Sequence, residues 1–288
     1  MHTLIFSISC SVAVSVLLKV ARARQIEVIQ AIAMNYVVAS ALCLLLFRPA
    51  PSSLFTPATP WWVLVTLGLM LPTIFLAMAA AVRHAGIVLS DAAQRLSLFI
   101  PLIASFMVFG EALSPNKAAG IVLALVALLL LLVRRRDGSA NHVQTGGNES
   151  SRAVFYLLCV WVGYGVIDIL FKQLARGGAA FSSSLLVTFV LAGIVIFSWL
   201  FARRTQWHAP SLKAGIILGL LNFGNIYFYV SAHQRFPENP TLVFSAMNIG
   251  VISVGTLVGA GFFKERLSLF NIAGIALAIT AIVLLIPK

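Results

Sequence analysis

The chain has 288 residues, of which 60% are hydrophobic and only 10% are charged, and its mean hydropathy is +1.01. A soluble domain is roughly a quarter charged, so this composition excludes a soluble globular protein and indicates one whose solvent is largely lipid. The net charge of +12 does not indicate nucleic-acid binding, because the basic residues flank apolar runs, as they do beside membrane spans.

A helix that crosses a bilayer needs about 17–25 predominantly apolar residues. Runs of this kind predict ten spans, listed here in chain order: 3–20, 29–47, 61–82, 88–109, 117–133, 153–172, 182–201, 212–232, 241–262 and 270–286. The first run has no basic segment before it, so we expect it to be retained as a span rather than cleaved as a signal peptide. The expected fold class is an all-α integral membrane protein.

One long polar segment, residues 138–151, interrupts the apolar runs and has the composition of a flexible linker. It separates residues 1–137, with spans one to five, from residues 152–288, with spans six to ten. Five is an odd number, so the second part must enter the membrane from the opposite side. The sequence therefore predicts two inverted-topology repeats of five helices each.

The ends of the two parts carry the repeat signal. FGEALSPNKAAGIVLALVALLLL begins at Phe109 and FKERLSLFNIAGIALAITAIVLL begins at Phe263, and they agree at about half of their positions. Ser114 before a proline predicts a capped helix start. Gly120 and its equivalent Gly274 predict close packing of helices.

Two acids, Glu111 and Glu265, occupy equivalent positions just before the last span of each part. Each lies in a turn beside a serine. We interpret them as structural turn residues that fix the entry of the last helix of each repeat.

Several of these features resemble the drug/metabolite transporter superfamily, in its ten-span branch of two EamA-type repeats. They are Lys19 and Lys172 near the ends of spans one and six, the GEALS and KERLS turns, and AVRHAG after span three. The resemblance covers nearly the whole chain and implies a secondary transporter with a central cavity between its halves. Four-span multidrug members carry an essential acid in their first helix. The first span here, LIFSISCSVAVSVLLKV, has none, which argues against proton-driven export of lipophilic cations unless another carboxylate has taken over.

Ionisable residues inside spans are candidates for substrate binding or coupling, because each costs about 2.5–3.5 kcal/mol to insert. Asp91 and Arg95 in span four, and Asp168 and Lys172 in span six, stand four residues apart, so each acid shares a helix face with a base. They are either functional charges, with a base for a substrate carboxylate and an acid for a proton, or static ion pairs. Lys172 could instead snorkel to the membrane interface.

Neutral polar residues form a second group of candidates. Asn222, Asn225 and Tyr229 lie on one face of span eight. Such amides either bind a ligand or join neighbouring helices. Gln94 and Asn248 occupy equivalent positions in the two repeats, and we expect them at a cavity.

Trp161 and Tyr164 lie beside two glycines in span six. Their rings could wall a pocket while the glycines let another helix approach, or they could lie at a lipid interface. We expect His84 and His233, near the ends of spans three and eight, at the membrane interface.

The sequence therefore predicts a secondary transporter for a small polar or amphipathic metabolite, amino-acid-like or similar, moved by alternating access of the two repeats around a central cavity. The alternative is a proton-coupled multidrug or lipophilic-cation exporter, followed by a membrane assembly subunit or an enzyme. No HExxH, GxSxG or Cys/His set supports an enzyme, and we expect no cofactor or metal.

The expected partners are a small-molecule substrate, the lipid bilayer and, as a candidate coupling ion, protons, with the chain a monomer or homodimer. Lys and Arg are more frequent in the loops after odd-numbered spans. This bias predicts a cytoplasmic linker and extracytoplasmic termini in a bacterial inner membrane.

Overall fold

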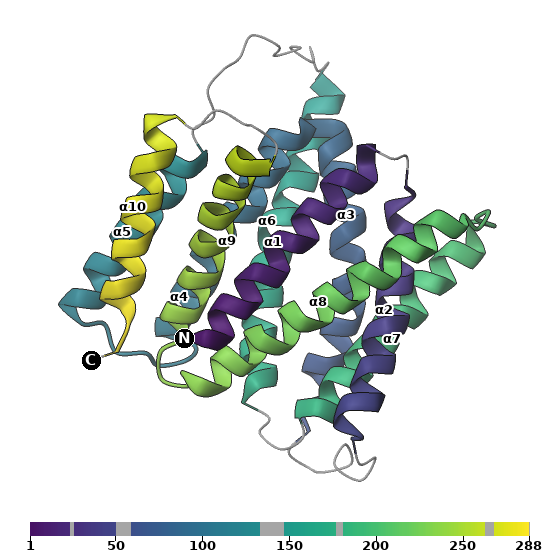
Figure 1. Ribbon diagram of the computed structural model, residues 1–288, viewed down its shortest axis with the longest axis horizontal. Coiled ribbons are helices and arrows are strands. Elements are labelled where there is room, and N and C mark those ends of the chain that lie inside the picture. The colour runs from purple at the N-terminus through teal and green to yellow at the C-terminus, as the bar shows by residue number, and fades with distance from the viewer. Residues whose placement is uncertain (24–25, 50–58, 133–146, 177–180, 263–267, 288) are drawn as a thin grey trace. The chain divides into compact units, whose positions relative to one another are not determined.

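A computed structural model describes residues 1–23, 26–49, 59–132, 147–176, 181–262 and 268–287, and the regular elements among them are all helices (Figure 1). In chain order these are α1 (His2–Ala23), α2 (Val28–Phe47), α3 (Trp61–Leu96), α4 (Phe99–Met107), α5 (Pro115–Leu132), α6 (Gly147–Ala175), α7 (Phe181–Ala202), α8 (Ala209–Arg235), α9 (Pro240–Phe262) and α10 (Leu269–Leu285). Within the described residues, seven helices are long and apolar enough to cross a membrane, and two shorter apolar stretches lie at His2–Leu18 and Leu269–Leu285. The chain is thus a helical, multi-pass membrane protein.

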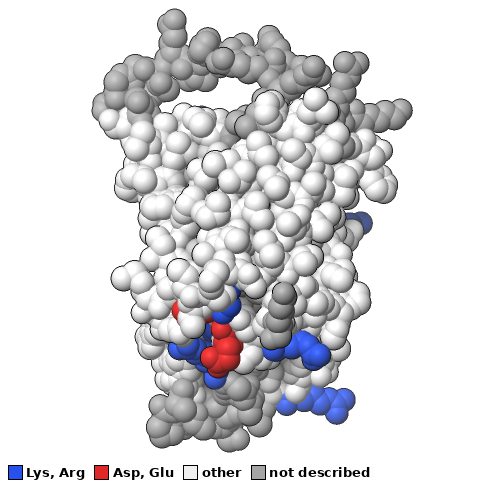
Figure 2. Space-filling model, turned by 90° about the vertical axis from the view of Figure 1, so that its left-hand side faces the viewer, with Lys and Arg blue, Asp and Glu red and all other residues white. Residues whose placement is uncertain are grey.

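The surface of the helices agrees with a lipid environment. Large apolar side chains are exposed on several of them, including Leu45 at 72%, Phe155 at 61% and Val283 at 60%. Figure 2 shows one face on which most of the described surface is uncharged and the Lys, Arg, Asp and Glu side chains gather toward one end. A soluble monomer rarely exposes so many large apolar side chains, whereas acyl chains would cover them favourably.

α3 contains the third predicted span and the start of the fourth. Its two helical parts meet at Gly86, whose backbone is not helical, with a φ of 83° and a ψ of 165°. Glycine adopts this backbone conformation because it has no Cβ. The kink at Gly86 lies between the predicted ends of the two spans, so the boundary itself is where the sequence placed it.

The predicted fourth span, 88–109, is not one continuous helix. It is interrupted between the end of α3 at Leu96 and the start of α4 at Phe99. Pro101 accounts for the interruption, because it has no N–H for the carbonyl of Ser97 and its ring crowds that preceding turn. The Ser97 carbonyl accepts instead from the Ile100 N–H at 3.0 Å.

By packing, the chain forms two compact units, and neither coincides with one half of the sequence. The first unit is Met1–Leu76 with Ile167–Pro237, and the second is Ala77–Val166 with Glu238–Lys288. Each unit therefore combines helices from both sequence halves, and α3 and α6 contribute a part to each. α6 begins at Gly147, so the end of the predicted linker is helical, while residues 138–146 lie outside the described residues.

In the first unit, α8 packs against α1 and α2, and α2 also packs against α7 (Figure 1). Two glycines one turn apart on α8 allow a close approach to α2. A Cβ on Gly215 would lie 2.6 Å from Met34 Cβ, and a Cβ on Gly219 would lie 2.6 Å from Val38 Cβ. Small residues at this spacing let membrane helices pack backbone to backbone.

In the second unit, α5 packs against α10, and α9 packs against both and against α4. The contact between α5 and α10 is reciprocal. A Cβ on Gly120 would lie 2.8 Å from Leu285 Cγ, and a Cβ on Gly274 would lie 2.8 Å from Leu131 Cγ. The start of each helix thus lies beside the end of the other, so the two run antiparallel. The prediction that both glycines are close-packing points is confirmed.

The predicted helix start after Ser114 is confirmed as well. α5 begins at Pro115, and the Lys117 N–H donates to Ser114 Oγ at 3.3 Å. The equivalent residue of α10, Ser268, accepts from the Asn271 N–H at 3.1 Å, and its own N–H donates to Asn271 Oδ1 at 3.1 Å. Both helices therefore begin with a side chain that satisfies a backbone donor left free by helix geometry.

Candidate functional site

The polar face of α8 is the centre of a hydrogen-bonded cluster in the first unit. Asn222 donates from Nδ2 to Oδ1 of Asn35 on α2 at 3.1 Å. One turn on, Ser7 of α1 donates to Oδ1 of Asn225 at 2.9 Å. The predicted shared face therefore exists, and two of its amides join helices, which was one of the two interpretations left open. The sequence alone did not identify Ser7 and Asn35 as their partners.

The third residue of this face, Tyr229, brings an acid into the cluster. Its hydroxyl donates to Oδ1 of Asp168 on α6 at 2.8 Å. The Tyr229 ring meets Phe171 edge-on, with centroids 6.1 Å apart, and meets His233 edge-on at 4.9 Å. The Asp168 carboxylate thus lies against a buried phenol within an aromatic environment, where a charge is much less screened than in water.

His233 itself is 1% exposed, so it is buried against other helices, and its place at the level of the membrane interface stays a prediction. It falls one turn after Tyr229 on α8, on the buried side of the helix. His84, in the second unit, is half-buried and stacks on Tyr156 with centroids 5.3 Å apart.

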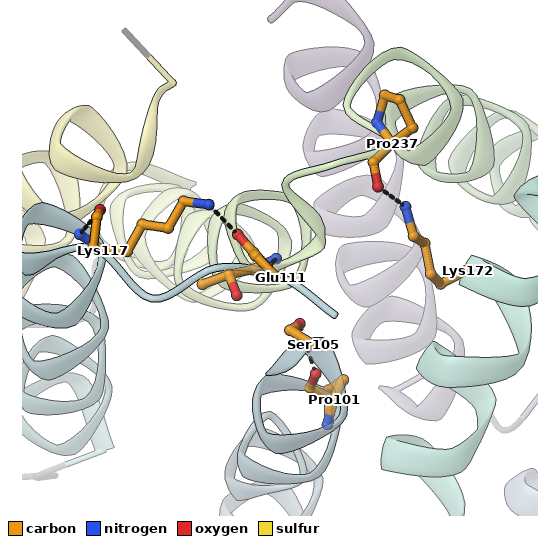
Figure 3. A network of polar contacts seen from close by, with 8 residues as sticks. Pro101, Ser105, Glu111, Lys117, Lys172 and Pro237 are labelled. Carbon is orange, nitrogen blue, oxygen red and sulfur yellow. Dashed lines mark hydrogen bonds and ion pairs between the residues drawn. The ribbon is translucent and has the colours of Figure 1, made fainter. Parts of the chain in front are cut away.

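Lys172 is a fully buried charged residue, at 1% exposure. Its ammonium donates to the backbone carbonyl oxygen of Pro237, in the turn after α8, at 2.7 Å (Figure 3). The Lys172 ammonium is therefore held by a backbone carbonyl at the end of α8, while its depth in the membrane stays a prediction. Lys19, the corresponding lysine near the end of span one, lies where the structure describes no side chain.

Asp91 and Arg95 form the ion pair that their spacing predicts, with Arg95 Nε 3.5 Å from Asp91 Oδ1 in the second unit. The Asp91 side chain is 54% exposed and that of Arg95 is 19% exposed. The pair is therefore a neutralisation of an acid by a base one helical turn away.

Gln94 and Asn248 are both half-buried residues of the second unit. Asn248 Nδ2 donates to the carbonyl of Phe244, one turn earlier on its own helix, at 3.1 Å. The backbone carbonyl of Gln94 accepts from Ser97 Oγ at 2.6 Å.

Trp161 and Tyr164 lie on the part of α6 that belongs to the second unit, and both are half-buried. The Trp161 indole N–H donates to the carbonyl of Leu96 at 3.0 Å. A Cβ on Gly165 would lie 2.6 Å from Ile100 Cβ, so a glycine of this segment does let another helix approach, as the sequence suggested.

Glu111 is a buried acid that joins the starts of two helices in the second unit. Its Oε1 lies 2.9 Å from Lys117 Nζ in the first turn of α5 (Figure 3). Its Oε2 accepts from the Thr241 N–H at the start of α9 at 2.9 Å. A carboxylate is stabilised at a helix N-terminus by the free N–H groups and the helix dipole. Glu265, its sequence equivalent, lies outside the described residues.

The described part of the chain contains no group of three or more His, Cys, Asp or Glu residues that could hold a metal ion. The ionisable groups that the sequence analysis singled out lie in both units: Asp168 with Tyr229 and the buried Lys172 in one, and Asp91 with Arg95 in the other.

Comparison with known proteins places the chain among relatives. No protein-family model matches it. A protein of Haemophilus influenzae, described as an uncharacterized protein, is 50% identical over 289 residues, which cover 98% of this chain and 96% of that protein. The two proteins belong to one family. A crystal structure of another protein has a TM-score of 0.74 at 17% identity, covering 98% of this chain and 94% of that chain. At this identity the likeness shows the fold alone.

Proposed function

We propose that the chain is a secondary transporter that moves a small polar or amphipathic metabolite across the membrane by alternating access of two inverted repeats. The observation that carries this proposal is the reciprocal packing of α5 and α10. Gly120 meets Leu285 and Gly274 meets Leu131 at the same 2.8 Å, and these are equivalent residues of the two sequence halves. A two-fold axis in the membrane plane relates inverted repeats in this way.

The arrangement of the other helices supports the same proposal. α2 packs against α7 and α4 packs against α9, and each of these pairs also consists of equivalent helices of the two halves. With the end of α3 and α4 counted together as a broken fourth span, each half has five spans. Five spans per half reverse the topology of the second half, so the same site can open to either side.

The binding and coupling role falls on the ionisable residues of the helices. Lys172 is fully buried and Asp168 is bound by a buried tyrosine. Because such groups cost about 2.5–3.5 kcal/mol each to insert, their presence is best explained by a substrate or proton that they bind. An acid and a base one helical turn apart suit a molecule carrying both charges, such as an amino acid.

Further parts of the proposal rest on the sequence. They are membership of the drug/metabolite transporter superfamily, location in a bacterial inner membrane with extracytoplasmic termini, and the absence of enzymatic activity. The relative in Haemophilus influenzae supports a bacterial membrane.

Uptake into liposomes tests the proposal. Purified protein is reconstituted and supplied with amino acids, sugars, nucleosides and lipophilic cations, with and without an imposed pH gradient. We expect saturable uptake of one metabolite class that is lost in Asp168→Asn or Arg95→Gln. Glu238→Gln is the matched control, because it removes an exposed carboxylate in the turn after α8 that belongs to neither candidate pair, and it should retain uptake.

The other outcomes discriminate between the alternatives. Gradient-driven cation transport lost only in Asp168→Asn would identify a proton-coupled multidrug exporter. Uptake unchanged by both substitutions would show that these charges are structural. No flux for any compound would refute the transporter proposal in favour of an assembly subunit or an enzyme.

A further inference from the structure

The break between α3 and α4 frees backbone carbonyls that a continuous helix would satisfy. In an α-helix each carbonyl accepts from the N–H four residues later. Around the break, the carbonyl of Arg95 accepts from the Leu98 N–H at 3.3 Å, and that of Ser97 accepts from the Ile100 N–H at 3.0 Å. The carbonyl of Gln94 accepts from Ser97 Oγ at 2.6 Å.

Two carbonyls lose their helical donors at the break. The Gln94 carbonyl would accept from the Leu98 N–H, which bonds Arg95 instead, and it accepts from Ser97 Oγ within the same turn. The second is the carbonyl of Leu96. Its regular partner would be the Ile100 N–H, which bonds Ser97 instead. The Leu96 carbonyl is satisfied from another helix, by the Trp161 indole N–H at 3.0 Å. In a bilayer core water does not replace a missing donor, so this bond is required by the break.

A second contact of α6 lies on the other side of the same break. Gly165 is one turn after Trp161, and a Cβ there would lie 2.6 Å from Ile100 Cβ. α6 thus touches both Leu96 and Ile100, the residues that flank the interruption. Any side chain at 165 would push these segments apart and lengthen the Trp161 bond.

The two residues immediately before Leu96 are Gln94 and Arg95, both candidates for substrate binding or coupling. The geometry of the break between α3 and α4 sets how the end of α3, which carries Gln94 and Arg95, is oriented relative to α4. The carbonyls of residues 94–97 each accept a hydrogen bond, and these bonds fix the geometry of the break. The sequence equivalent of Pro101 is Gly255, inside the continuous helix α9, so this device belongs to one half of the chain.

We propose that Trp161 is a positioning residue, which holds the broken fourth span through the Leu96 carbonyl and thereby orients Gln94 and Arg95 toward the substrate. This inference rests on the proposed function and adds to it that Trp161 acts through the helix break rather than by contact with substrate.

A double-mutant cycle with Pro101 tests the hydrogen bond without any substrate. Pro101→Ala supplies an N–H for the Ser97 carbonyl and returns the Ile100 N–H to Leu96. Trp161→Phe should lower the melting temperature of the purified chain by about 2 °C or more, the shift expected for one hydrogen bond in a chain of this size. In the Pro101→Ala background the same change should lower it by less than half as much. Trp62→Phe is the matched control, since that ring is 62% exposed, and it should cause no shift.

Benzothienylalanine at position 161 separates the N–H from ring size, because it keeps the bicyclic ring and lacks the donor. It should reproduce the Trp161→Phe shift. Equal shifts in both Pro101 backgrounds, or no shift with the analogue, would overturn the proposed bond. This cycle reads stability alone, so its result stands whether or not uptake is found.

A second measurement tests positioning. With the native cysteines replaced, Gln94→Cys is labelled with a water-soluble thiol reagent. We expect Trp161→Phe to change the labelling rate at least threefold, and Trp62→Phe to leave it unchanged. In the uptake assay, Trp161→Phe should lower the maximal rate more than it changes KM. An unchanged labelling rate would show that Trp161 is a structural residue only. Absent uptake in the unmodified protein would refute the transporter proposal but would leave the hydrogen bond between Trp161 and the Leu96 carbonyl unaffected.

Discussion

The reciprocal packing of α5 and α10 gives the sharpest prediction, because the two contacts can be perturbed separately. In Gly274→Ala the new methyl group would lie 2.8 Å from Leu131 Cγ and 3.2 Å from the Ala127 carbonyl oxygen. In Gly120→Ala it would lie 2.8 Å from Leu285 Cγ and 3.4 Å from the Ala281 carbonyl oxygen. In each case a leucine must move, and a backbone carbonyl limits the room behind the glycine.

Overpacking of this kind costs about 1–3 kcal/mol. For a chain of this size that corresponds to a fall of about 2–6 °C in melting temperature. Leu131→Ala removes the obstructing side chain but leaves a cavity, which by itself costs about 2–5 kcal/mol. In the double variant Gly274→Ala with Leu131→Ala, the added methyl partly fills that cavity. The two changes should therefore cost at least about 1 kcal/mol less together than the sum of their separate effects.

The assay is thermal unfolding of the purified chain in detergent, for the single and double variants. The matched control exchanges partners: Gly274→Ala with Leu285→Ala should be additive. Gly120 and Leu131 are separated on α5 by about 16 Å, at 1.5 Å per residue, so the two contacts are independent. The reciprocal packing would be refuted if Gly274→Ala showed the same deviation from additivity with Leu285→Ala as with Leu131→Ala. It would also be refuted if neither glycine variant changed the melting temperature. Either result would remove the observation on which the transporter proposal depends.

Three further predictions follow from single contacts. Lys172→Met keeps the length of the side chain but removes the ammonium bound to the Pro237 carbonyl. Because that acceptor is left without this donor, we expect a loss of about 1–3 kcal/mol in stability together with loss of uptake, and retained uptake would remove Lys172 from the site. Glu111→Gln breaks the ion pair with Lys117 and should cost about 2 kcal/mol in unfolding free energy, measured by thermal melting, with an unchanged melting temperature contradicting the reasoning. Gly219→Leu places atoms where a Cβ already meets α2 at 2.6 Å and should prevent accumulation of folded protein in membranes, judged by size-exclusion chromatography; a monodisperse variant would show that α2 and α8 pack less closely than described.

Local signals predicted the start of α5 and the packing points of α5 and α10. A serine before a proline caps a helix wherever it occurs, because the free N–H groups of the first turn are its neighbours in sequence. Glycines within a strongly apolar helix likewise indicate a close approach, although the sequence did not name the partner leucines. Gly215 and Gly219, one turn apart on α8, carry the same signal for close helix packing.

The broken fourth span also had a signal in the sequence. Pro101 lies in the middle of an apolar run, and a hydropathy scan treats it as one more tolerated residue. Backbone hydrogen bonding, not hydropathy, decides whether a helix continues through a proline. Because Pro101 has no N–H for the Ser97 carbonyl, the helix is expected to break close to Ser97.

In the candidate site, one contact followed from local sequence spacing and the others depended on tertiary packing. The spacing of Asp91 and Arg95 determined their ion pair, since residues four apart on a helix are neighbours whatever surrounds them. The partners of Asn225, Tyr229 and Lys172 lie far away along the chain, and only the packing of α8 on other helices decided them. By itself the sequence determined that the chain is a helical membrane protein and which helix faces are polar, because transfer from water to lipid depends on local composition. Which polar groups meet depends on where helices distant in sequence come together, and that was decided by the tertiary structure.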